Sequence, residues 1–168
     1  MTQTSVIELM MYQIGQLFLL PVLVLVAAMF GYSLYALGSF CVQTVQRRRR
    51  IPGLGTLAGH PLLAYAQGQP KASMDELDLH AHKMLEPVRL ASRIAPMLGL
   101  VGTMIPMGPA LKSLSDGNLA QVSGSLTVAF SVVIIALIAA SITYWIANVR
   151  RRWLAEEMIE IQNGREAA

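Results

Sequence analysis

The 168-residue sequence carries little charge and almost no cysteine. Charged residues make up 14% of it, whereas a typical soluble domain has about 25%. Because 54% of the residues are hydrophobic, too few charges remain to cover a globular surface, and the composition predicts a protein whose solvent is the lipid bilayer. The single cysteine, Cys41, excludes an internal disulfide and any cysteine-clustered zinc or iron–sulfur site.

The chain also lacks the residue groupings on which enzymes depend. It contains no nucleophile–base pair, no phosphate-binding loop and no cluster of metal ligands. His80 and His82 are two residues apart, a spacing that places them on different faces of a helix and makes them a poor metal pair. We therefore predict that the protein is not an enzyme and has no catalytic residues, no metal site and no cofactor.

Three apolar stretches are long enough to cross a bilayer, which takes roughly 20 residues with about 17 as a minimum. They cover residues 17–42, 94–111 and 126–148, and the second and third contain no charged residue. The sequence therefore predicts an all-α, polytopic membrane protein with three transmembrane helices. Residues 1–16, 43–93, 112–125 and 149–168 are expected to lie in water.

The positive charges are distributed unevenly over the four segments that are expected to lie in water. Residues 43–93 hold eight lysines and arginines, residues 149–168 hold four, residues 112–125 hold only Lys112, and residues 1–16 hold none. Positive charge is retained in the cytoplasm, so we predict an inner-membrane protein with residues 1–16 and 112–125 outside and the other two segments inside. The run Arg47–Arg50 is interpreted as an anchor at anionic lipid rather than a nucleic-acid site.

The predicted cytoplasmic segment begins with a stretch rich in proline and glycine, residues 51–70, which is typical of a loop or a short re-entrant turn. A helix is expected to begin next, because Ser73 and Glu76 have the spacing of a capping box. Pro87 is expected to end or kink that helix.

Small and hydroxyl-bearing residues recur at helical spacing in the second and third spans. Ala95, Gly99 and Thr103 are four residues apart, and Gly102 follows Gly99 by three. Small residues at this spacing let helices approach closely in lipid, so we expect Ala95, Gly99 and Gly102 to serve helix packing. In the third span Thr127, Ser131 and Ser141 fall near one stripe, with Thr143 off it.

The second and third spans contain no Asp, Glu, Lys, Arg or His. Ionisable groups within the bilayer are the usual carriers of protons and ions. If the protein serves a proton path, it supplies walls of hydroxyl groups, and the titrating group must come from another chain. One copy cannot enclose the hydroxyl and small-residue seams, which predicts a homo-oligomeric ring.

Residues 95–104, with the sequence APMLGLVGTM, resemble the corresponding segment of the MotA/TolQ/ExbB proton-channel family. The start of the third span, Leu126-Thr127-Val128-Ala129-Phe130, and its exit into a basic tail are similar as well. The resemblance covers roughly residues 88–155, and the three-span layout is that of ExbB and TolQ rather than of the four-span flagellar stators.

The resemblance implies a ring, commonly a pentamer, around the single spans of ExbD/TolR-like partner chains. The partner's span bears an aspartate that takes up and releases protons, and Thr103 and Thr127 match the family's pore hydroxyls. With Ser131 and Ser141 they form the predicted pore lining. Proton flow would then drive a motion that the partner transmits as force outside, energising transport.

The chain departs from the ExbB pattern in several respects, one of which lies just before the third span. ExbB-like members often carry a glutamate just before the third span, whereas residues 121–125 contain no acid. The system served, the cargo and the choice between H⁺ and Na⁺ therefore stay open. The alternative is a non-conducting membrane scaffold or permease subunit whose spans only pack.

Overall fold

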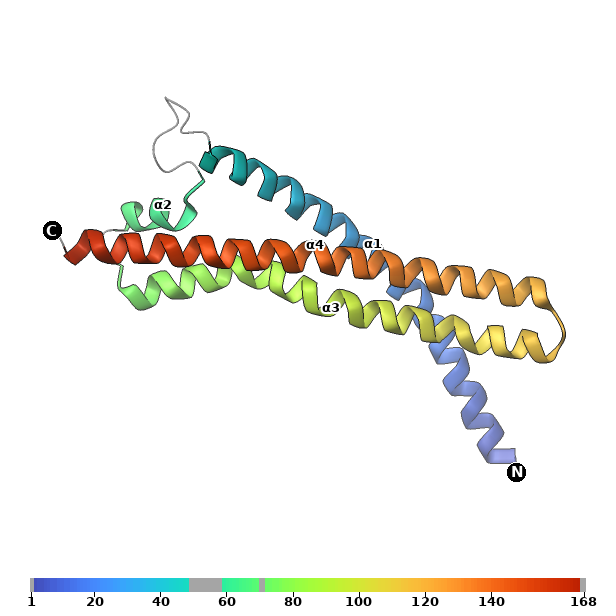
Figure 1. Ribbon diagram of the computed structural model, residues 1–168. Coiled ribbons are helices and arrows are strands. Elements are labelled where there is room, and N and C mark those ends of the chain that lie inside the picture. Colours follow the sequence, from blue (N-terminus) through green and yellow to red (C-terminus); the bar gives the residue numbers. More distant parts are fainter. Residues whose placement is uncertain (1, 49–58, 70–71, 167–168) are drawn as a thin grey trace. The chain divides into compact units, whose positions relative to one another are not determined.

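The computed structural model describes residues 2–48, 59–69 and 72–166, and all regular secondary structure in them is helical. The elements are α1 (Thr2–Arg48), α2 (Pro61–Gly68), α3 (Met74–Ser115) and α4 (Leu119–Glu166), labelled in Figure 1. The chain divides into two compact units. The first unit comprises Met1–Ser33 and Ala91–Ser141, and the second comprises Leu34–Leu90 and Ile142–Ala168.

Three helices of the described residues are long and apolar enough to cross a membrane, within Tyr12–Arg47, Met74–Ser115 and Leu119–Glu166. This finding confirms the expected all-α, multi-pass class. At a rise of about 1.5 Å per residue, each helix exceeds the roughly 30 Å of a hydrocarbon core, so its ends must protrude. The boundaries of the three spans within these helices stay a prediction, as does the side of the membrane that each end faces.

The segment before α3 differs in part from its prediction. The capping box is present, because Ser73 N donates to the Glu76 carboxylate at 3.0 Å and Glu76 N donates to Ser73 Oγ at 3.2 Å. The expected loop is wrong for residues 61–68, which form α2. Pro61 occupies the first helical position, where its missing N–H has no intrahelical partner to lose. Residues 51–58 lie outside the described part of the chain.

Pro87 does not end the helix that the capping box begins, because α3 continues through it to Ser115. Proline removes the N–H that would bond the carbonyl four residues earlier, here that of Lys83. Both residues are exposed, so water can satisfy that carbonyl and the helix continues.

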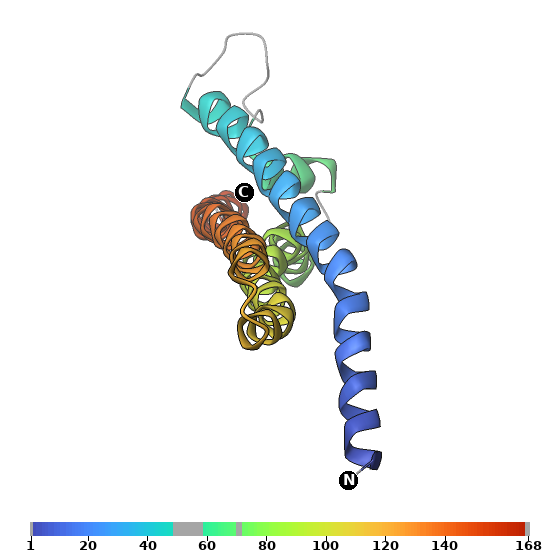
Figure 2. The same cartoon turned by 90° about the vertical axis from the view of Figure 1, so that its right-hand side faces the viewer.

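The turn between α3 and α4 is only three residues long and uses Gly117 in a left-handed conformation, at φ 74°. Asn118 N donates to Ser113 O at 2.9 Å, and Gly117 N donates to Leu114 O at 3.1 Å, the pair of bonds that defines a Schellman cap. Asn118 then caps α4, since its Oδ1 accepts from Gln121 N at 3.2 Å. The short turn makes α3 and α4 antiparallel neighbours, and they lie side by side in the two views of Figures 1 and 2.

In the first unit α3 packs closely on α4 at the glycines that the sequence suggested for helix packing. A Cβ built on Gly99 would lie 2.8 Å from the Ala136 Cβ, and one on Gly102 would overlap Val132. Ala95 is buried among Ala139 and Ala140. These small side chains allow the two helices to make contact along their backbones, which favours association in lipid.

A hydrogen bond joins α1 to α3 where a proline has removed a backbone donor. Pro109 has no N–H, so the carbonyl of Ile105, four residues earlier, lacks its helical partner. Gln16 Nε2 of α1 donates to that carbonyl at 3.3 Å. Freed backbone groups in membrane helices must be satisfied by neighbouring elements, and Gln16 does so here.

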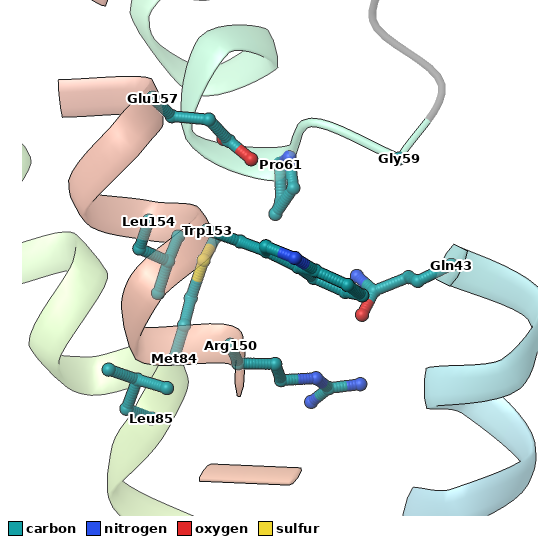
Figure 3. Close-up of a pocket in the computed structure, with 9 residues that line it drawn as sticks. All are labelled: Gln43, Gly59, Pro61, Met84, Leu85, Arg150, Trp153, Leu154 and Glu157. Atoms are coloured by element: carbon teal, nitrogen blue, oxygen red, sulfur yellow. The ribbon is translucent and has the colours of Figure 1, made fainter. Parts of the chain in front are cut away.

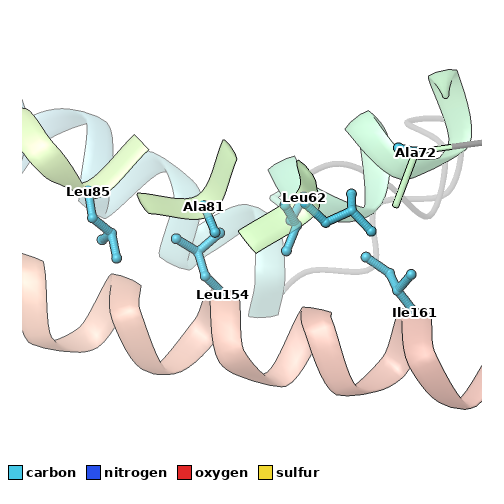
Figure 4. Close-up of a cluster of buried hydrophobic side chains, with 7 residues drawn as sticks. Leu62, Ala72, Ala81, Leu85, Leu154 and Ile161 are labelled. Carbon is cyan, nitrogen blue, oxygen red and sulfur yellow. The ribbon is translucent and has the colours of Figure 1, made fainter. Parts of the chain in front are cut away.

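The second unit has an apolar core formed by α2, α3 and α4 (Figure 4). Leu154 and Ile161 of α4 point toward Leu62 of α2 and Ala81 of α3. Leu62 and Leu77 are completely buried, and burying a side chain of this size contributes about 1.5–3 kcal/mol. Burial of Leu62 therefore explains why the eight residues of α2 are helical although so short a helix is not stable alone.

The contact at Gly99 leads to a prediction about stability. We expect Gly99→Ala to lower the free energy of unfolding of the purified protein by about 1–3 kcal/mol, the usual effect of overpacking, because the Ala136 Cβ cannot move without its backbone. Thermal unfolding in detergent, followed by circular dichroism, measures the effect. The control is Gly31→Ala on α1, where no atom lies within 4 Å of the new Cβ. Equal melting temperatures for the two variants would show that the close contact is absent.

Candidate functional site

An open groove in the first unit carries two of the predicted pore hydroxyls. Thr127 and Ser131 of α4 line it, facing Leu23, Val26 and Ala27 of α1 across a volume of about 350 Å³. The remaining lining residues are apolar residues of α4, namely Val128, Val132 and Ile135. The groove is therefore mainly apolar, with two hydroxyl groups on its α4 wall.

Each predicted pore hydroxyl donates its hydrogen to its own helix. Thr127 Oγ1 donates to Ser123 O at 2.9 Å and Ser131 Oγ donates to Thr127 O at 2.8 Å. The other two follow the same pattern, Thr103 to Leu100 O at 2.7 Å and Ser141 to Leu137 O at 2.8 Å. A hydroxyl has one donor and two acceptor lone pairs, so Thr127 and Ser131, which line the groove, offer hydrogen-bond acceptors to whatever occupies it.

The structure does not bring all four hydroxyls together within one copy. Thr103 is half-buried on α3 and Ser141 is exposed on α4, and neither is among the described residues that line the Thr127–Ser131 groove. Thr143, expected to lie off the stripe, is 1% exposed. A common pore lining for Thr103, Thr127, Ser131 and Ser141 stays a prediction about an assembly of several copies.

A buried carboxylate organises the second unit. Glu157 of α4 is 1% exposed, and its Oε1 forms an ion pair with Arg47 of α1. Its Oε2 accepts from the backbone N–H of Leu62 at 2.9 Å and of Leu63 at 3.4 Å. Glu157 thus supplies the cap that α2 lacks from its own sequence, and the partial positive charge of a helix N-terminus favours a carboxylate at this place.

Arg47 completes this polar cluster. Its Nε donates to Gly59 O at 2.9 Å, its Nη2 lies 3.0 Å from His60 Nδ1, and its guanidinium lies 4.6 Å from the centre of the Trp153 ring. Gly59 has a φ of 89°, and a Cβ there would come within 3.0 Å of the Arg47 side chain. A larger residue at position 59 would therefore be strained in its backbone and crowded against Arg47.

A cavity of about 270 Å³ adjoins the cluster. Figure 3 shows the Trp153 ring reaching from α4 toward Gln43 of α1, with Arg150 pointing the same way. Arg150 Nη2 donates to Ser39 Oγ at 3.0 Å, and Trp153 stacks on Phe40 with ring centroids 5.2 Å apart. These contacts fix the end of α1 to α4 within the second unit.

The described residues contain no group of three or more His, Cys, Asp and Glu side chains that could hold a metal ion. His80 stacks on Tyr65 at 3.9 Å between ring centroids, and His82 Nδ1 lies 3.5 Å from the carboxylate of Asp78 on the preceding turn. Both histidines therefore have structural contacts.

The polar cluster was not predicted from the sequence, although the position of one of its residues, Glu157, pointed to it. Glu157 lies three residues after Leu154 and four before Ile161, so it shares the face on which these two residues are buried. An acid on a buried helical face needs a partner. The partners Arg47 and His60 are distant in the sequence, and no local pattern points to them.

The model of the MotA/TolQ/ExbB proton channel family matches residues 69–163, more than half of the chain. The match includes α3 and nearly all of α4, with Thr103, Thr127 and Glu157. No curated protein and no solved structure matches the chain. The resemblance noted in the sequence is thereby confirmed, and the chain belongs to the MotA/TolQ/ExbB proton channel family.

Proposed function

We propose that this chain is the ring-forming subunit of a proton-driven motor in the cell inner membrane. In this proposal it surrounds an ExbD/TolR-like single-span partner that bears an intramembrane aspartate, and the partner transmits force that energises transport. Family membership supports a proton-channel type of function. The ring that we propose is a pentamer, as is common in this family.

The observation that carries the proposal is the groove in the first unit. It presents Thr127 and Ser131 on an apolar wall, while residues 94–111 and 126–148 contain no Asp, Glu, Lys, Arg or His. An ion at the bilayer centre costs at least about 2.5–3.5 kcal/mol, and hydroxyls do not titrate near neutral pH. Such a surface can solvate a proton carrier without carrying the charge itself.

The hydrogen bonds of the hydroxyls suggest which form of the carrier they favour. The hydrogens of Thr127 and Ser131 are used by backbone carbonyls, so their free lone pairs accept hydrogen bonds. A protonated carboxyl group can donate one, whereas a carboxylate can only accept. The groove therefore favours the neutral, proton-loaded form of a partner aspartate as it passes through the hydrocarbon.

The same hydrogen bonds also suit the alternative, a non-conducting scaffold or permease subunit. A hydroxyl that is satisfied by its own helix needs no partner, and Thr127 would then contribute nothing to ion flow. The two functions differ in proton flux: a non-conducting scaffold gives none, whereas the flux of a proton path should fall when one hydroxyl of its wall is lost.

The proposed function includes a topology in which residues 1–16 lie outside the cytoplasm and residues 149–168 lie inside it. A reporter enzyme that is active only in the cytoplasm should give no signal when fused at residue 2 and full signal when fused after residue 168, because the lysines and arginines gather in residues 43–93 and 149–168 and positive segments stay inside. Activity at residue 2, or silence at residue 168, would reverse the orientation or change the number of spans.

Loss of the Thr127 hydroxyl should reduce proton flux. Thr127→Val keeps the shape of the side chain and removes one hydrogen-bond acceptor, worth about 0.5–1.5 kcal/mol, which corresponds to roughly a two- to tenfold slower rate. The flux is measured by quenching of a pH-sensitive dye in liposomes that hold the chain with its Asp-bearing partner under an imposed pH gradient.

Thr44→Val is the matched control for this measurement. Thr44 on α1 makes the same kind of bond to its own helix, donating to Phe40 O at 2.8 Å, but it does not line the groove. The control should conduct like the wild type. Flux at the wild-type level from Thr127→Val in correctly assembled complexes would show that this hydroxyl does not serve the proton path. No flux above that of empty liposomes from the wild type with its partner would favour the non-conducting scaffold.

A further inference from the structure

His60 contacts two groups of opposite charge through one ring nitrogen. Its Nδ1 lies 3.0 Å from Arg47 Nη2 and 3.4 Å from Glu157 Oε1. The side chain of His60 is 31% exposed, while that of Glu157 is 1% exposed, so protons from water reach the imidazole directly. Arg47 of α1 and Glu157 of α4 are the charged side chains that contact His60 in the described part of the chain.

The two contacts require different protonation states. A neutral imidazole with its hydrogen on Nε2 presents a lone pair at Nδ1, which accepts from Arg47. A protonated imidazole has a hydrogen on Nδ1, which can donate to Glu157 but places a second positive charge beside the guanidinium. The contact with Arg47 therefore belongs to neutral His60, and the contact with Glu157 belongs to charged His60.

We propose that His60 is a pH-responsive switch that controls how firmly Arg47 holds the end of α1 in the second unit. When His60 is neutral, Arg47 bonds to Glu157, His60 and the Gly59 carbonyl together. Protonation removes one acceptor from Arg47, adds a like charge next to it and introduces a competitor for Glu157 Oε1. Histidine is the side chain that ordinarily changes charge between about pH 5 and 8.

Protonation of His60 weakens the contacts that hold α1 and leaves the cap of α2 in place. The second oxygen of Glu157 stays on the Leu62 and Leu63 N–H groups in either state, so α2 keeps its cap. Arg47 is the group that loses contacts when His60 gains a proton. Because residues 43–93 are cytoplasmic in the proposed topology, and only if that topology holds, the switch responds to acid on the side where the protons arrive.

Trp153 reports on this change, because the Arg47 guanidinium lies 4.6 Å from the centre of its ring. Trp145→Phe leaves Trp153 as the one tryptophan of the chain. The full chain, purified in detergent, is titrated between about pH 8 and 5 while the tryptophan emission is recorded. We expect a single sigmoidal change in emission as Arg47 moves.

His60→Asn is the decisive variant. The asparagine Oδ1 can accept from Arg47 as Nδ1 does, but it cannot be protonated, so the transition should be lost and the emission should stay at its high-pH value. His80→Asn and His82→Asn are matched controls, because their rings contact Tyr65 and Asp78 instead, and both should retain the transition.

The chain that keeps both tryptophans serves as a second test, which does not depend on how Trp145→Phe folds. Its emission should show the same His60-dependent change. A transition that survives in His60→Asn, or a wild type with no transition, would overturn the proposal. The readout needs neither a partner nor proton flux, so its failure is separate from failure of the proposed channel function.

Discussion

A proton crosses hydrocarbon on a titratable carrier or along a continuous chain of water, and the predicted second and third spans of this chain contain no Asp, Glu, Lys, Arg or His that could be the carrier. Residues 94–111 and 126–148 have no side chain that ionises as a carboxylate, amine, guanidinium or imidazole. What remains for a proton path is shape and hydrogen bonding: the glycines that bring α3 against α4, and the groove in which Thr127 and Ser131 face α1. The family match supports a proton-channel type of function, and in the function that we propose such a wall serves a carrier that belongs to another chain.

Hydrogen bonding within lipid explains the details of the first unit. Where Pro109 leaves the Ile105 carbonyl without a backbone donor, the Gln16 side chain supplies one. The hydroxyls of Thr127 and Ser131 donate to backbone carbonyls of their own helix. Polar groups in hydrocarbon need such partners. The consequence for function is chemical: the groove is left with acceptors, which suit a protonated acid better than an ionised one.

The sequence predicts those features that depend on local patterns. The apolar runs predict three candidate spans, Ser73 and Glu76 predict the start of α3, and the segment around Gly99 and Thr103 predicts the family; the structure and the family match confirm all three. It did not predict α2, because a proline such as Pro61 begins a helix as readily as it ends one, and burial of Leu62 decides between them. The meeting of Arg47, His60 and Glu157 depends on contacts about a hundred residues apart in the chain, as does the α1 wall of the groove, and neither is visible in residue spacing.

In the proposed function this chain forms the wall of a proton path and another chain carries the proton. The most direct test is the proton permeability of liposomes that contain the purified chain alone, under an imposed pH gradient and compared with empty liposomes. We expect no flux above that of empty liposomes, and flux should arise when a single-span, Asp-bearing partner is added. Full flux from this chain alone would contradict it, because the carrier would then lie within a chain whose second and third spans offer hydroxyls and no acid.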